Sequence, residues 1–235
     1  MAFAHPAYQP TPAPSQADRG LTGNVSFQEL RQQAYRDFCG GDFPELPETA
    51  EEARAIAAIL QAPAESDPLQ LREKASRANV FAFNQNERLD KYHYLVFAMH
   101  GVLPDEVKNL AQPALVLSDD FLKMADVFGL HLNAKLVALS ACNTGQGIPV
   151  NGEGVMGLTR AFMYAGTPAV AVTLWSVQSQ SARDLDIGFF RQLNAGLPPA
   201  QALQAIKGQM LRGELGESYR HPYYWAPFVV FGDGK

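Results

Sequence analysis

The sequence has little cysteine and no cluster of basic residues. Only two cysteines occur in 235 residues, Cys39 and Cys142, and they do not form a Cys-x-x-Cys motif. This excludes a zinc knuckle and gives no sign of a disulfide framework, so a reducing, cytoplasmic setting is favoured. The formal net charge is −5, and Lys and Arg are scattered along the chain. We therefore expect no direct contact with nucleic acid.

The chain also lacks long apolar runs. None approaches the roughly 18 residues that a membrane-spanning helix needs. The first residues do not combine a basic segment with an apolar core, so we expect neither a membrane span nor a secretory signal. The length of 235 residues suits one domain, or one domain with a tail.

The first part of the chain differs from the rest. Met1–Ala4 resembles the end of a strand, and residues 9–23 are rich in Pro, Ala and polar residues, which predicts a flexible loop. A short helix is expected over 27–38. We assign residues 1–43 to a partial first strand with this loop, and residues 44–235 to one domain. The strand-like start also suggests that the chain is a piece of something longer.

Beyond residue 44, strands and helices alternate. The apolar runs that predict strands are 69–71, 92–99, 113–117, 136–139, 169–174 and 227–231. The segments with helical spacing or start signals are 48–60, 76–83, 122–127, 153–165, 179–193 and 198–211. In the first of these helices, Thr49 and Glu52 have the spacing of a capping box. The alternation predicts a parallel sheet with crossover helices on both faces.

Two predicted strands end in residues of chemical interest. Leu136–Leu139 leads through Ser140 and Ala141 to Cys142, and the run that ends at residue 99 leads directly to His100. Ligands and reactive groups gather at the carboxyl ends of parallel strands. If these strands are neighbours, the imidazole lies near the thiol, where it can activate the thiolate and protonate a leaving amine.

Other readings of these residues stay open. A lone buried cysteine often serves as a small core residue, and a histidine at a strand end often just binds a loop. Cys39 lies in an ordinary loop context. Asp119 and Asp120 suit either a solvated turn or the wall of a substrate pocket, and Trp175 suits either a cleft wall or the end of a core strand.

Five segments together resemble a known family. They read HYLVFAMHG, ALVLSDD, LVALSACNTGQG, GEGVMGLTRAFMYAGTPAVAVTLWSV and HPYYWAPFVVFG. In this order they are similar to the CHAT domain, a member of the caspase–separase group of cysteine peptidases. The resemblance covers the chain from about Pro44 onward. It implies an α/β, caspase-like three-layer sandwich with a central, mostly parallel sheet of about six strands.

The resemblance also implies a catalytic dyad. The family's histidine falls on His100 and its nucleophile on Cys142, while the backbone N–H groups of Gly101 and Cys142 would form the oxyanion hole. The implied activity is that of a cysteine endopeptidase, which cleaves a protein or peptide substrate through a thioester and needs no metal or cofactor. Such domains often follow tetratricopeptide-type repeats, so control by a partner or an upstream region is expected.

Two alternatives to an endopeptidase remain. One is a catalytically silent caspase-like module for assembly or signalling, although such a module has no need of both His100 and Cys142. The other is a different acyl-transfer or hydrolytic reaction by the same dyad. A peptidyl probe directed at thiols separates the silent module from the peptidase.

The expected substrate pocket contains Asp119, Asp120, Trp175 and Gln178. The family often has an acidic residue just after the WSV-like segment, where this sequence has Gln178 and Ser179. An unpaired basic side chain is costly to bury. We therefore predict that the pocket does not demand Arg or Lys before the scissile bond, unless Asp119 or Asp120 supplies the missing charge.

Overall fold

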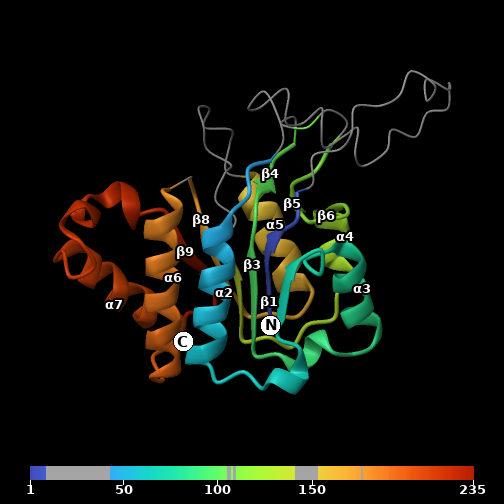
Figure 1. Ribbon diagram of the computed structural model, residues 1–235, viewed down its shortest axis with the longest axis horizontal. Coiled ribbons are helices and arrows are strands. Elements are labelled where there is room, and N and C mark those ends of the chain that lie inside the picture. The colour runs from blue at the N-terminus through green and yellow to red at the C-terminus, as the bar shows by residue number, and fades with distance from the viewer. Residues whose placement is uncertain (9–42, 105–106, 108–109, 141–152, 176) are drawn as a thin grey trace.

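A six-stranded sheet forms the centre of the molecule (Figure 1). The computed structural model describes residues 1–8, 43–104, 107, 110–140, 153–175 and 177–235. In spatial order the strands are β2 (Leu69–Arg72), β1 (Ala2–Pro6), β3 (Tyr94–Ala98), β7 (Leu136–Leu139), β8 (Ala169–Thr173) and β9 (Phe228–Gly232). All neighbours are parallel except β8 and β9, which are antiparallel.

The middle strands are apolar because helices cover both of their faces. Every residue of β7 is buried, and so are the last four residues of β3. On one face of the sheet, the rings of Phe3 and Phe97 stack with their centroids 5.3 Å apart. These strands run in the same direction, so they all end on one side of the sheet, which we call its carboxyl edge.

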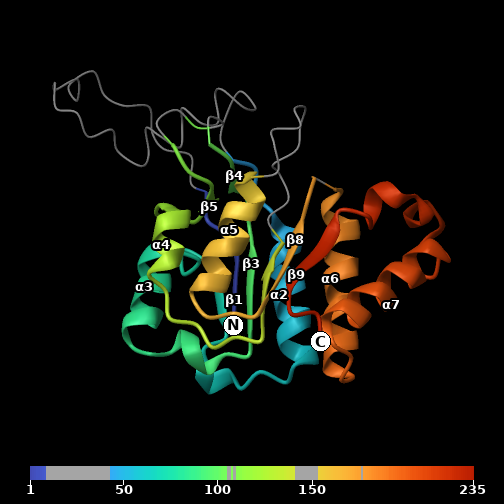
Figure 2. The same cartoon turned by 180° about the vertical axis from the view of Figure 1, so that it is seen from behind.

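Helices cover both faces of the sheet (Figures 1 and 2). One face packs against α3 (Arg77–Gln85), α4 (Met124–Phe128) and α5 (Glu153–Tyr164), and the other against α2 (Pro47–Ile59), α6 (Ser179–Asn194) and α7 (Pro199–Leu211). Gly188 lets α7 lie close to α6, because a Cβ atom there would be 2.2 Å from Cδ1 of Ile206. Short 3-10 helices span Ala64–Ser66, Leu89–Lys91, Glu217–Arg220 and Pro222–Tyr224.

A small antiparallel sheet follows directly on the end of β3. It consists of β4 (Gly101–Val102), β5 (Ala114–Val116) and β6 (Phe121–Lys123). Val102, Ala114 and Phe121 are buried in a core of their own together with Tyr8 and Phe43. This packing fixes the chain immediately after His100, at the carboxyl edge of the main sheet.

The predicted architecture is confirmed, because the protein is a mixed α/β sandwich with a central, mostly parallel sheet of six strands. The capping box of the first predicted helix is wrong. Pro47 begins the helix before Thr49, so the N-cap of α2 is Leu46, whose apolar side chain cannot accept a hydrogen bond from an N–H. Glu52 is therefore an interior position of the helix and points inward.

Two other expectations need comment. The helical turn predicted over 122–127 is half right, because β6 extends to Lys123 and α4 begins at Met124. The helix predicted over 27–38 lies outside the described residues. Within the described part of the chain, no helix combines the length and apolar character needed to cross a membrane.

Candidate active site

His100 is the best-defined member of the candidate site. It is the second residue after β3 and is 1% exposed. Its imidazole packs against the rings of Tyr8 and Phe43, whose centroids both lie 5.4 Å from its own and 5.8 Å from each other. Tyr8 comes from the segment after β1 and Phe43 from the segment before α2. Two segments that are far from β3 in the sequence thus hold the imidazole in place.

A backbone carbonyl fixes the proton on the His100 ring. Nε2 lies 2.8 Å from the carbonyl oxygen of Pro44. Because a carbonyl oxygen can only accept, Nε2 carries the hydrogen and Nδ1 is the basic nitrogen of the neutral ring. Burial lowers the pKa of His100, and the bond to Pro44 opposes this effect only in part. The imidazole is therefore neutral near pH 7 and able to accept a proton.

The backbone after His100 leaves the N–H of Gly101 outside the small sheet. Val116 N–H donates to His100 O at 2.8 Å, and Gly101 is paired with Leu115 in the next register position. In an antiparallel ladder, hydrogen-bonded and non-hydrogen-bonded pairs alternate. Gly101 therefore belongs to a non-hydrogen-bonded pair, and its N–H points away from β5.

The strand that leads to Cys142 lies beside the strand that leads to His100. β3 and β7 are parallel neighbours, as predicted, and every pair from Tyr94↔Leu136 to Phe97↔Leu139 is 42 positions apart in the chain. His100 and Cys142 are the same number of positions apart. Cys142 and the other cysteine, Cys39, lie outside the described residues.

Two buried carboxyl groups meet at Ser140, the first residue after β7. The Ser140 Oγ atom is 2.8 Å from Oδ2 of Asp186 and 3.3 Å from Oε2 of Glu52. Glu52 comes from α2 and is 2% exposed, and Asp186 comes from α6 and is 6% exposed. Helices α2 and α6 therefore both reach the strand end that precedes Cys142.

This arrangement requires a shared proton. The Ser140 hydroxyl has one hydrogen and cannot satisfy two carboxylates at once. Burial raises the pKa of Glu52 well above its ordinary value, with the charge of Asp186 adding to the effect. Burial also raises the pKa of Asp186 to about 7. The pair thus holds at least one proton at neutral pH, because two buried anions without a cation would repel each other.

Arg183, a described cation whose charge acts on Glu52, is engaged elsewhere. Its guanidinium binds Glu51 at 2.7 Å and Asp184 at 3.0 Å, which lie one and two positions from the buried acids in the sequence. The charge of Arg183 lowers the pKa of Glu52, but this effect is smaller than those of burial, of the Asp186 charge and of the hydrogen bond from Ser140. Within the described residues, Oε1 of Glu52 has no hydrogen-bond partner. A cavity of about 10 Å³, close to the size of one water molecule, lies beside Ser140 and Asp186.

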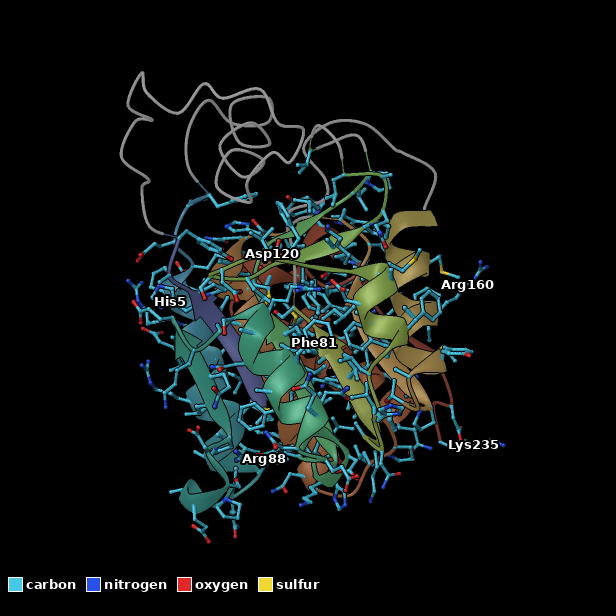
Figure 3. The ribbon with its side chains drawn as sticks, turned by 90° about the vertical axis from the view of Figure 1, so that its right-hand side faces the viewer. His5, Phe81, Arg88, Asp120, Arg160 and Lys235 are labelled. Carbon is cyan, nitrogen blue, oxygen red and sulfur yellow. The ribbon has the colours of Figure 1, made fainter. Side chains whose placement is uncertain are left out.

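Asp119 and Asp120 lie at the start of α3. The two oxygens of Asp119 accept hydrogen bonds from the backbone N–H groups of Arg77 at 2.6 Å and Ala78 at 3.0 Å. Asp120 accepts from Phe121 N–H at 2.7 Å and lies 3.9 Å from the Arg77 guanidinium. Figure 3 shows Asp120 beyond the upper end of α3. Both carboxylates thus have contacts that stabilise the fold.

Trp175 and Gln178 follow β8, the other neighbour of β7. Trp175 is partly exposed, and its indole N–H donates to Tyr223 O at 3.3 Å. Gln178 is the N-cap residue of α6, and its side chain is exposed. Both therefore lie near the carboxyl edge of the sheet, on the side of β7 away from His100.

Several residues around the site were not predicted from the sequence: Tyr8, Phe43, Pro44, Glu52, Ser140 and Asp186. A signal existed for the two acids. Asp186 lies on the inward face of α6 with Ala182 and Phe189, and Glu52 shares the inward face of α2 with Ile56. A charged residue on an apolar helix face indicates a buried polar contact. Pro44 acts through its carbonyl, which no residue pattern reveals.

In the described part of the chain, no three His, Cys, Asp or Glu side chains lie close enough to hold a metal ion. The described arrangement can support proton transfer at His100 Nδ1 and donation of a hydrogen bond by Gly101 N–H.

The fold and the buried histidine at the strand end define a caspase-like α/β protein. The family model of the CHAT domain matches residues 4–233, which is nearly the whole chain. The chain therefore belongs to the CHAT-domain family, as its sequence segments predicted.

Two curated relatives match about half of the chain. Tetratricopeptide repeat protein 28 of Mus musculus is 33% identical over 117 residues, which is 49% of this chain and 5% of the relative. The Homo sapiens protein of the same name is 34% identical over 117 residues, or 49% of this chain and 4% of the relative. The chain thus matches only a small part of these proteins.

Proposed function

We propose that the protein is a cysteine endopeptidase in which His100 activates Cys142. The observation that carries the proposal is the parallel pairing of β3 and β7 with a constant offset of 42 positions. The same offset separates His100 from Cys142. If the register continues past the two strands, it brings the imidazole and the thiol to the same place on the carboxyl edge of the sheet.

The environment of His100 supports the role of general base. Pro44 O holds the proton on Nε2, which leaves Nδ1 to accept a proton from the thiol. Burial lowers the pKa of His100 and so keeps the ring neutral until the thiol donates. In this role Pro44 orients the base, as a carboxylate does in other triads.

The orientation of Gly101 supports an oxyanion hole. Its N–H is not used in the small sheet and lies next to the proposed base. Glycine at this position lets a substrate carbonyl approach the backbone closely. Together with the N–H of Cys142, it would stabilise the charge that develops on the carbonyl oxygen, and each such donor typically contributes about 3 kcal/mol.

The proposed reaction has two steps. In the first, the proton of Cys142 moves to His100 Nδ1, the sulfur forms a bond to the substrate carbonyl carbon, and the peptide C–N bond breaks as His100 protonates the leaving amine. In the second, water attacks the thioester carbon while His100 accepts its proton, the C–S bond breaks, the carboxylic acid product leaves, and His100 returns the proton to the Cys142 sulfur.

The pocket for the residue before the scissile bond remains a proposal. We place Trp175 and Gln178 along it, because they follow the strand next to β7. Asp119 and Asp120 would contribute only at its rim, since their carboxylates already hold the start of α3. A tetratricopeptide-type region or partner is proposed as the regulator, since the curated relatives carry that repeat in their names.

A peptidyl probe directed at thiols, followed by mass-spectrometric mapping, tests the proposal. We expect the probe to modify Cys142 and not Cys39, and His100→Ala to reduce modification by about 10²-fold or more. A library of peptides then reports cleavage by the wild type, Cys142→Ala and Cys39→Ala. Because a regulator is expected, the assay is run on this chain and on any longer form of the protein.

The outcomes separate the candidate functions. Cleavage that is lost in Cys142→Ala and kept in Cys39→Ala supports the endopeptidase. If no probe modifies Cys142 and no form of the protein cleaves any peptide, the catalytically silent module is correct. Modification of Cys142 with turnover of small esters or amides, but without cleavage of any peptide or protein, indicates a different acyl-transfer reaction.

A further inference from the structure

A groove of about 520 Å³ lies between α7 and β9, the strand at one edge of the main sheet. Its lining is mostly apolar and includes Leu203, Leu211 and Trp225. Leu211, the last residue of α7, is 52% exposed and extends this apolar lining. The groove is therefore an apolar surface next to an open strand edge (Figure 2 shows the two elements).

The outer edge of β9 carries backbone groups that the sheet does not use. Asp233 N–H donates to Pro168 O at 2.8 Å, which fixes the alternation of the ladder between β8 and β9. Val229 and Phe231 then exchange hydrogen bonds with β8, while the N–H and C=O of Val230 point to the outer edge. Val230 also lines the groove.

This edge lacks the features that usually prevent strand addition. Exposed edge strands normally carry a charge, a proline or a bulge. The residues of β9 read FVVFG and contain neither charge nor proline. An extended peptide can therefore pair with this edge and place alternate side chains in the groove.

Lys207 gives the groove a charge. It lies on α7, lines the groove, and in the described part of the chain its ammonium has no hydrogen bond and no ion pair. Burial lowers its pKa. A cation that is partly removed from water and has no counter-charge favours a ligand that brings a carboxylate.

We propose that β9 and α7 form a docking groove for an extended segment of a partner protein, which pairs with the outer edge of β9 and sets a carboxylate against Lys207. A second copy of this chain fits less well. Its own β9 has no acidic residue, and it would bring a second Lys207 to the same interface. This interaction goes beyond the proposed peptidase activity and does not depend on Cys142.

Binding of model peptides tests the proposal. The probes are fluorescent eight-residue peptides of alternating Val and Thr with Glu, Gln or Lys at one central position, and the protein is the Cys142→Ala variant, so that no probe is cleaved. We expect the Glu peptide to bind about tenfold more tightly than the Lys peptide, with the Gln peptide between them. NMR amide shifts should be largest at Val230 and its neighbours in β9.

Three variants make the test specific. Lys207→Glu should invert the preference so that the Lys peptide binds best. Val230→Pro, which removes the outer N–H, should abolish binding of all three peptides. Arg212→Gln is the matched control, because Arg212 lies just after the same helix and is exposed and paired with Glu214. It should leave all affinities unchanged.

Three results would overturn the proposal. One is that no peptide binds. Another is that the Glu and Lys peptides bind equally well to both the wild-type groove and Lys207→Glu. The third is that the protein forms dimers in sedimentation experiments and that Val230→Pro or Lys207→Glu abolishes or alters their formation, because a second copy would then be the occupant.

Discussion

Acidic side chains gather around Arg77 and around Ser140, and the two regions differ in how they solvate and ionise these carboxyl groups. Around Arg77, Asp119 and Asp126 accept hydrogen bonds from N–H groups and lie partly in solvent. Around Ser140, Glu52 and Asp186 are buried, and no cation among the described residues forms an ion pair with them. The first region stabilises negative charge and the second excludes it, so the pKa values move in opposite directions.

The difference shows what each cluster can do for the fold. Partial burial alone would raise the pKa of Asp126. The hydrogen bonds from Arg77 and from Lys123 N–H outweigh this effect, so the pKa of Asp126 is lower than its ordinary value. It remains a carboxylate that fixes α3 to α4. Glu52 and Asp186 can be buried side by side only if at least one of them is protonated. Through Ser140, the pair joins α2 and α6 to the strand end before Cys142. The second cluster therefore makes the strand end before Cys142 sensitive to pH.

The largest expected effect is on the pH dependence of stability. The pKa of Asp186 is raised from 3.8 to about 7, and that of Glu52 is also raised. Between about pH 4 and about pH 7, the folded state therefore binds more protons than the unfolded state. The free energy of unfolding should fall as the pH rises from about 4 through about 7. Urea denaturation at several pH values measures this slope.

Matched variants identify the source of the slope. Asp186→Asn and Glu52→Gln should each flatten it, because an amide cannot ionise. Asp184→Asn and Glu51→Gln remove neighbouring charges on the same helices and should leave it in place. Equal slopes in all five proteins would show that the buried pair holds no shared proton.

The next effect concerns the hydroxyl between the two acids. Ser140→Ala removes the only side chain hydrogen-bonded to either of them in the described residues, and we expect a loss of about 1–3 kcal/mol in the free energy of unfolding. Ser76→Ala serves as the comparison, because it removes the N-cap hydrogen bond of α3, and such a loss typically lowers the free energy of unfolding by about 1 kcal/mol. A Ser140→Ala protein as stable as the wild type would mean that the contact contributes nothing.

A smaller effect is expected at the paired cluster. Asp126→Asn weakens the bidentate bond to Arg77 and should cost about 1 kcal/mol at pH 7. Because the pKa of Asp126 is lowered, its contribution is present above the ordinary value of 3.8 and is lost as the pH falls through the lowered pKa. Acid titration of the wild type and the variant should converge at low pH, and parallel curves would contradict this account.

The smallest effect is expected at Asp120. It is partly exposed and lies 3.9 Å from Arg77, which is at the limit of an ion pair. Asp120→Asn should change the free energy of unfolding by less than about 0.5 kcal/mol. A larger loss would place Asp120 in the same network as Asp126. A change in the peptide cleavage profile without loss of stability would support its place at the rim of the pocket.

The sequence predicted the sheet better than the site. Strand 136–139 and helix 179–193 were found because an apolar run and a helical spacing are local patterns, and both elements agree with the structure within one residue at either end. The candidate nucleophile and base were found because they follow such runs. The direction of β9 was not predicted, since no local pattern distinguishes a parallel from an antiparallel edge strand.

The contacts around the site depend on tertiary structure, so the sequence could indicate that Glu52 and Asp186 are buried but not which residues they contact. Glu52 fitted a capping box in the sequence, but Pro47 moves the start of α2 and turns Glu52 toward Ser140. Pro44 orients His100 through a backbone oxygen, which every residue has. Such contacts join segments more than 40 positions apart, and a single sequence gives no distance between them.

The reactivity of Cys142 tests the central claim most directly, namely that His100 activates this thiol. Iodoacetamide is added at pH 6.5, and mass spectrometry follows the alkylation of Cys142 and Cys39 in the same molecule. Cys142 should react about tenfold or more faster than Cys39, and His100→Ala should remove the difference. Equal rates at the two cysteines, unchanged by His100→Ala, would contradict the claim.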